Sequence, residues 1–133
     1  MVNYPEKETY TYEDLVHILR ILRAPGGCPW DREQTHESNR RNFLEEAYEA
    51  AEAFDLDDPE LMEEELGDVL FAAVKVGRFC GVDPEAALSK TCEKFIARFR
   101  KVEETVNARG EDMSALPLDE LMALWNNAKE QLR

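Results

Sequence analysis

The feature that most constrains this sequence is an acidic stretch, Leu44–Asp68, which holds twelve acidic residues and no basic one. The 133-residue chain has a formal net charge of -13, so this stretch accounts for nearly all of it. Inside it, Asp58, Pro59 and Glu60 supply an N-cap, a first-turn proline and a first-turn acid. The stretch therefore predicts two helices joined by a short turn.

Two patterns inside this stretch place carboxylates on one side of a helix, where residues three apart lie about one turn apart. The first pattern, E-E-x-x-E, comprises Glu45, Glu46 and Glu49, and the second, E-x-x-D, comprises Glu65 and Asp68. At about 1.5 Å rise per residue, the two patterns lie level across an antiparallel hairpin. We therefore expect one pair of carboxylates from each helix to converge.

Glu65 differs from the other acids of the stretch because a helical wheel places it within an apolar stripe. Its neighbours on that stripe are Leu61, Met62, Val69 and Ala72. A carboxylate in such a place is costly unless a cation compensates it, and no Lys, Arg or His lies nearby in sequence. These observations favour a metal site over a solvated helix face. Because all the ligands are carboxylates, Mg²⁺ is the first candidate and Mn²⁺ the second.

Composition and length narrow the class of protein. A chain of 133 residues predicts a single domain over 1–133. Its acidic balance argues against direct binding of nucleic acid or a membrane surface. The longest wholly apolar run, Val69–Val74, is too short to cross a bilayer, and the start does not resemble a leader, so a cytoplasmic protein is expected. Three cysteines without a C-x-x-C pattern favour reduced thiols.

The remaining segments predict further helices and no strand. Thr11–Arg23 reads as a short amphipathic helix, 24–31 as a loop, 83–107 as a long helix and Leu118–Leu132 as the last helix. An apolar seam is expected along the long helix at Leu88, Cys92, Phe95, Phe99, Val102 and Val106. Ser38 is expected to cap the first acidic helix. The fold class predicted is an all-α helical bundle of four to five helices.

Two other features allow alternative interpretations. Trp30 in the proline- and glycine-rich loop is either an anchor that packs the loop onto the bundle or a stacking platform for a planar ligand. A basic line along the long helix comprises Lys90, Lys94, Arg98 and Lys101. Such a line is usually solvated surface or a partner for acidic groups, but it also suits the binding of phosphates.

Taken together, these segments resemble the MazG family of nucleoside triphosphate pyrophosphohydrolases. The two acidic patterns match the family's E-E-x-x-E and E-x-x-D motifs, and residues 27–38 are similar to its G-C-P-W-D-x-x-Q-T-H-x-S segment. Residues 94–103 and 124–129 continue the similarity. The chain departs from the family pattern at Asn39, where Leu is usual, and at Pro117, where a polar cap is frequent.

The resemblance implies Mg²⁺-dependent hydrolysis of a nucleoside or deoxynucleoside triphosphate to monophosphate and pyrophosphate. It also implies a bundle completed by dimerisation, as a homodimer or a higher homo-oligomer. The metal ligands implied are Glu46, Glu49, Glu65 and Asp68. The substrate contacts implied are Lys94, Arg98, Trp125 and Lys129, with Trp30 as a further candidate.

The residues themselves leave three points open. Either Glu45 or Glu49 can act as the general base that takes a proton from water. The substrate can be narrower than a general nucleotide, for instance dUTP, dCTP or phosphoribosyl-ATP, because a stacking tryptophan tolerates every base. A protein of another class, a non-catalytic acidic helical dimerisation module, also fits the composition, but it leaves the carboxylate of Glu65 in an apolar stripe without a function.

Overall fold

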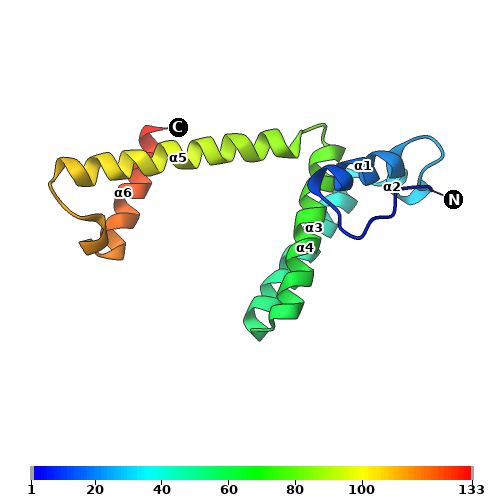
Figure 1. Ribbon diagram of the computed structural model, residues 1–133, viewed down its shortest axis with the longest axis horizontal. Helices are drawn as coiled ribbons and strands as arrows, with labels where there is room; N and C mark the ends of the chain where they lie inside the picture. Colours follow the sequence, from blue (N-terminus) through cyan, green and yellow to red (C-terminus); the bar gives the residue numbers. More distant parts are fainter. Residues whose placement is uncertain (1, 133) are drawn as a thin grey trace. The chain divides into compact units, whose positions relative to one another are not determined.

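The computed structural model describes residues 2–132, and those residues form helices and connecting segments without a strand (Figure 1). The all-α prediction is confirmed. The elements are α1 (Tyr12–Arg23), α2 (Pro29–Glu33), α3 (His36–Leu56), α4 (Pro59–Phe79), α5 (Pro84–Ala108), the 3-10 helix η1 (Met113–Ala115) and α6 (Leu118–Gln131). None of the described helices has the length and apolar character needed to span a bilayer. The chain divides into two compact units, the first ending at Pro84 and the second beginning at Glu85.

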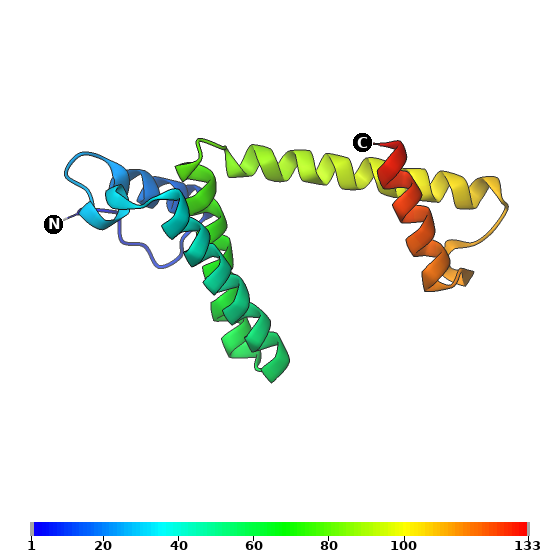
Figure 2. The ribbon, with the colours of Figure 1, turned by 180° about the vertical axis from the view of Figure 1, so that it is seen from behind.

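The first unit is built on the predicted antiparallel hairpin, in which α3 and α4 lie side by side in both views (Figures 1 and 2). Asp58 caps α4 as predicted, because its side chain accepts hydrogen bonds from the backbone N–H groups of Glu60 and Leu61. Asp57 adopts the left-handed conformation at φ 52° and ends α3. The local chemistry of the turn thus brings the two acidic helices together.

The start of α3 differs from the prediction in one residue. Thr35, and not Ser38, is the N-cap, and Ser38 is the third helical residue of a reciprocal capping box with it. In this capping box, the Thr35 hydroxyl accepts from the Ser38 backbone N–H and the Ser38 hydroxyl accepts from the Thr35 backbone N–H. Asn39 follows as a buried polar residue whose side-chain amide donates to the Thr35 carbonyl oxygen at 2.9 Å. That hydrogen bond satisfies the amide nitrogen, whereas Asn39 Oδ1 is buried without a hydrogen-bond partner among the described residues.

The segment between α1 and α3 was predicted as a loop, but Pro29–Glu33 forms the short helix α2. Pro29 occupies the first turn, where a missing backbone N–H has no consequence. Before it, Gly27 lies so close to the end of α1 that an added Cβ would clash with the carbonyl oxygen of Leu22. The Cys28 backbone N–H donates to the same oxygen at 2.8 Å, so the segment is fixed against α1. At the other end of α1, Thr11 and Asp14 form a capping box.

The second unit contains α5, η1 and α6. Its core consists of Val102 and Val106 on α5 packed with Leu124 and Ala128 on α6. The predicted seam is therefore buried only at its last two members, whereas Leu88, Cys92, Phe95 and Phe99 are exposed. The buried residues of α6 pack against Val102 and Val106, and no other described residue of α5 is buried. Pro117 stands at the N-cap of α6, where a polar residue is frequent in the resembled family, and it makes no side-chain capping bond.

Candidate metal centre

Three of the four predicted ligands converge across the α3–α4 hairpin. Glu46 and Glu49 from α3 and Glu65 from α4 each offer one carboxylate oxygen, and these oxygens lie within 4.8 Å of one another. Residues 46 and 49 lie one turn apart, so both side chains lean toward the same part of α4. The level register predicted from the lengths of the two arms thus holds for these three residues.

Glu65 is the member of this cluster that is least compatible with a purely structural role. Its Oε2 atom is buried and has no hydrogen-bond partner among the described residues. Desolvation raises the pKa of Glu65, and the negative charges of Glu49, Asp68, Glu64 and Glu46 raise it further. Burial and like-charge repulsion both disfavour the ionised carboxylate. A bound cation would relieve both effects.

The other two predicted acids occupy different positions. Asp68 lies one turn after Glu65 on α4, is exposed, and contributes to the charge felt by Glu65 without joining the three-oxygen cluster. Glu45 is exposed on α3 and lies outside the cluster. Of the two candidates for the general base, Glu49 therefore belongs to the cluster and Glu45 does not.

The donor set fits a hard divalent cation. Three carboxylates supply only oxygen ligands, and Mg²⁺ and Mn²⁺ prefer oxygen ligands. An unpartnered buried oxygen on Glu65 is available to a metal ion without breaking an existing hydrogen bond. The residues that could hold such an ion are Glu46, Glu49 and Glu65, with Asp68 one turn away on the same helix.

Sequence reasoning missed two residues behind this cluster, of which one contacts Glu46 and the other contacts the first. The side-chain amide of Asn42 donates to Glu46 Oε1 at 2.9 Å, and Lys75 Nζ donates to Asn42 Oδ1 at 2.6 Å. Lys75 is far from Glu46 in sequence, so proximity along the chain gave no sign that the two are linked through Asn42. A wheel of α4 gives the signal that was available, because Lys75 lies two turns after Asp68 on the same side of the helix.

The basic and aromatic candidates lie in the second unit. Lys94 and Arg98 are one turn apart on α5, and Trp125 and Lys129 are one turn apart on α6. The ring of Trp125 contacts that of Phe95, with centroids 5.3 Å apart, which joins the two helices beside Lys94. The Nε atom of Arg98 is buried without a hydrogen-bond partner among the described residues. The second unit thus places Arg98, whose Nε–H lacks a hydrogen-bond partner within the described part of the chain, one turn after Phe95 of the aromatic pair.

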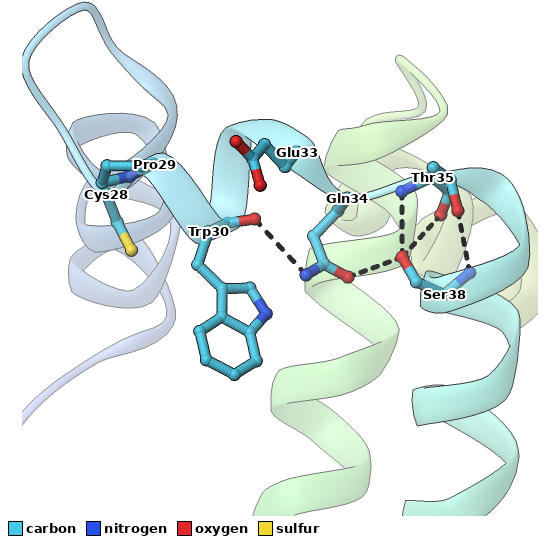
Figure 3. Close-up of a pocket in the computed structure, with 7 residues that line it drawn as sticks. All are labelled: Cys28, Pro29, Trp30, Glu33, Gln34, Thr35 and Ser38. Atoms are coloured by element: carbon cyan, nitrogen blue, oxygen red, sulfur yellow. Dashed lines mark hydrogen bonds between the residues drawn. The ribbon is translucent and has the colours of Figure 1, made fainter.

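Trp30 lines a pocket of about 630 Å³ at the start of α3 (Figure 3). Trp30 is 77% exposed, so it does not anchor this segment within the described structure. The other lining residues are Cys28, Pro29, Glu33, Gln34, Thr35 and Ser38. The Gln34 amide donates to the Trp30 carbonyl oxygen and its Oε1 accepts from the Ser38 hydroxyl at 2.7 Å, so the polar wall of the pocket is ordered.

Residues 34–103, more than half of the chain, match the family model described as MazG nucleotide pyrophosphohydrolase domain. The chain belongs to the MazG family. The match spans the whole acidic hairpin and the whole basic line, so the carboxylate cluster lies inside the MazG domain.

Similar proteins agree with this assignment. A Thermotoga maritima protein named nucleoside triphosphate pyrophosphohydrolase/pyrophosphatase MazG is 46% identical over 72 residues, which cover 54% of this chain and 28% of that protein. An Escherichia coli K12 protein named nucleoside triphosphate pyrophosphohydrolase is 44% identical over 84 residues, covering 63% of this chain and 31% of that protein. The chain thus spans about a third or less of the length of these two relatives.

A solved structure matches over nearly its full length. The crystal structure of a mazG-related protein from Thermotoga maritima superposes with a TM-score of 0.62 and 30% sequence identity, covering 89% of this chain and 98% of that one. The all-helical MazG fold is therefore shared, and the correspondence extends beyond the matched domain.

Proposed function

We propose that this chain hydrolyses nucleoside triphosphates to monophosphate and pyrophosphate with a divalent cation, Mg²⁺ first and Mn²⁺ second. The observation that carries the proposal is the buried, unpartnered carboxylate oxygen of Glu65 within a three-carboxylate cluster of a MazG domain. The relatives named as nucleoside triphosphate pyrophosphohydrolases support the reaction class. A non-catalytic dimerisation module leaves that carboxylate unexplained.

In the proposed reaction, water attacks the α-phosphorus, the bond from that phosphorus to the bridging oxygen breaks, and pyrophosphate leaves with the oxygen. A divalent ion, when bound, supplies positive charge to the phosphate oxygens and activates water. Glu46, Glu49, Glu65 and Asp68 are proposed to hold it. The proton lost by water passes to Glu45 or Glu49. Glu49 is the exposed member of the cluster, and Glu45 is the exposed carboxylate outside it.

The phosphates also require cations from the protein. Lys94 and Arg98 are proposed phosphate ligands, and Trp125 and Lys129 further substrate contacts. The unpaired Nε of Arg98 supports this role, because a buried guanidinium N–H without a partner is available to a phosphate oxygen. Arginine and lysine both form charge-assisted hydrogen bonds with phosphate.

The pocket beside Trp30 is the proposed site for the base. Its end at Ser38 lies one turn before Asn42 and two turns before Glu46 on α3. Eight residues of helix correspond to about 12 Å. A nucleoside in the pocket could therefore direct its phosphates along α3 toward the acidic cluster. Because the exposed indole offers a face for stacking, we expect little discrimination between bases.

The products test the reaction class. Incubation of the protein with a panel of ribo- and deoxynucleoside triphosphates and Mg²⁺ is expected to release monophosphate and pyrophosphate in equal amounts. Chelation of the divalent ion is expected to stop the release. Nucleoside diphosphate and inorganic phosphate as the first products, measured by anion-exchange chromatography, would place the protein among phosphatases instead.

We also propose a homodimer or a higher homo-oligomer. The α3–α4 hairpin exposes several large apolar side chains, namely Tyr48, Phe54, Leu56, Leu66, Leu70 and Phe71. Large apolar side chains exposed in this number are typical of an interface between protein chains. Sedimentation equilibrium is expected to give a multiple of the 15.3 kDa chain mass. A concentration-independent mass of one chain would contradict the proposal.

A further inference from the structure

A lysine lies behind the acidic cluster without pairing with it directly. Lys75 Nζ donates to Asn42 Oδ1 at 2.6 Å, and Asn42 Nδ2 donates to Glu46 Oε1 at 2.9 Å. Lys75, Asn42 and Glu46 are all partly buried. These two hydrogen bonds therefore link Lys75 on α4 to Asn42 on α3, and through Asn42 to the carboxylate of Glu46 in the cluster.

The orientation of the Asn42 amide follows from its two partners. An ammonium group can only donate hydrogen bonds, and an ionised carboxylate can only accept them. The amide oxygen must therefore face Lys75 and the amide nitrogen must face Glu46. Among side chains, a primary amide can accept from a lysine and donate to a carboxylate at the same time. Asn42 thus acts as an adaptor between two charged groups that do not form an ion pair with each other.

We propose that Lys75 is a positioning residue for the candidate metal centre, where it acts through the Asn42 amide to fix the carboxylate of Glu46 in the orientation that a divalent cation requires. This inference rests on the proposed metal site. A lysine that contacted Glu46 directly would compete with the metal ion for the carboxylate. With the amide between them, Oε1 is held while the second carboxylate oxygen stays available.

The strength of the contact supports this role. A hydrogen bond to a charged group is stronger than one between neutral groups, and each end of the Asn42 amide meets a charged partner. The positive charge of Lys75 polarises the amide and strengthens its donation to Glu46. Partners of this kind, which hold a metal ligand without touching the ion, change metal affinity or activity about 10- to 100-fold when they are removed.

Removal of Lys75 can either weaken or tighten binding of the cation, and the direction of the change distinguishes two roles for the lysine. A positive charge near a cation site repels the ion, and a lysine that only compensates the metal-free carboxylates would weaken metal binding. Removal of such a lysine would tighten the binding of the cation. Removal of a positioning lysine would weaken it.

The test measures Mn²⁺ binding to the full chain by calorimetric titration, with nucleotide hydrolysis measured in parallel. Lys75→Met and Asn42→Leu are each expected to weaken Mn²⁺ binding about 10-fold or more. The double variant is expected to bind no more weakly than either single variant, because both changes break the same chain of contacts. Lys75→Arg, which keeps a charged donor, is expected to retain near wild-type affinity.

Arg40→Met is the matched control, since it removes one positive charge from an exposed position on α3. Unchanged or tighter Mn²⁺ binding in Lys75→Met would overturn the inference, as would additive losses in the double variant. Should Lys75→Met fail to fold by circular dichroism, Asn42→Leu and Lys75→Arg decide between the same outcomes. A wild-type protein that binds no Mn²⁺ would contradict the proposed metal site itself.

Discussion

Replacement of Glu65 by Gln is expected to abolish nucleotide hydrolysis, with a loss of more than about 100-fold, while the metal-free protein stays as stable as wild type or becomes more stable. The side chain keeps its shape but loses its charge. In the metal-free state, that charge is partly desolvated and repelled by Glu46, Glu49 and Asp68. The same substitution is expected to remove most of the rise in melting temperature that Mg²⁺ gives by binding the native state.

Glu63→Gln is the matched control, because it removes one negative charge from an exposed position on the same helix. Thermal melts with and without Mg²⁺ and a hydrolysis assay measure both variants. Retained hydrolysis in Glu65→Gln would remove this residue from the site. A metal-free variant markedly less stable than both wild type and Glu63→Gln would instead indicate that the carboxylate has a structural partner.

Lys94→Ala and Arg98→Ala are expected to lower kcat/KM without unfolding the protein. Each substitution deletes a charge-assisted contact with phosphate worth about 1.5 to 3 kcal/mol, which corresponds to about 10- to 150-fold in kcat/KM. The buried core of the second unit, Val102, Val106, Leu124 and Ala128, does not include either residue. Steady-state kinetics and circular dichroism therefore separate a loss of binding from a loss of structure.

Lys90→Ala serves as the control for the basic line, since Lys90 is exposed one turn before Lys94 on the same helix. We expect its kinetics to match those of the wild type. Lys101 is less suitable, because it lies 3.9 Å from Glu104 in an ion pair. Equal and negligible effects at Lys90, Lys94 and Arg98 would show that the line is solvated surface, as most such lines are.

Much of the local structure was readable from the sequence because short-range rules govern it. The turn at Asp58 and Pro59 depends on one capping side chain and one restricted φ angle, and both act within four residues. The position of Glu65 on the buried side of α4 follows from the 3.6-residue period alone. The two acidic motifs also carried the resemblance to the MazG family, which the family match later confirmed.

Other features depended on contacts between residues far apart in the chain. The exposure of Leu88 and Phe95 was not predictable from their spacing, because a periodic pattern marks an apolar side of a helix but does not say whether another element covers it. The exposure of Trp30 on α2 likewise depends on what packs around that segment and not on its composition.

The clearest contribution of the tertiary structure is the position of the Lys75 ammonium group behind the acidic cluster. The sequence by itself determined the helices, the acidic register and the unusual place of Glu65, because all three follow from local geometry. It did not link Lys75 to Glu46, because Asn42, which joins them, lies 33 positions from Lys75. Only the packing of α4 against α3 brings the ammonium group to the amide, and through it to Glu46.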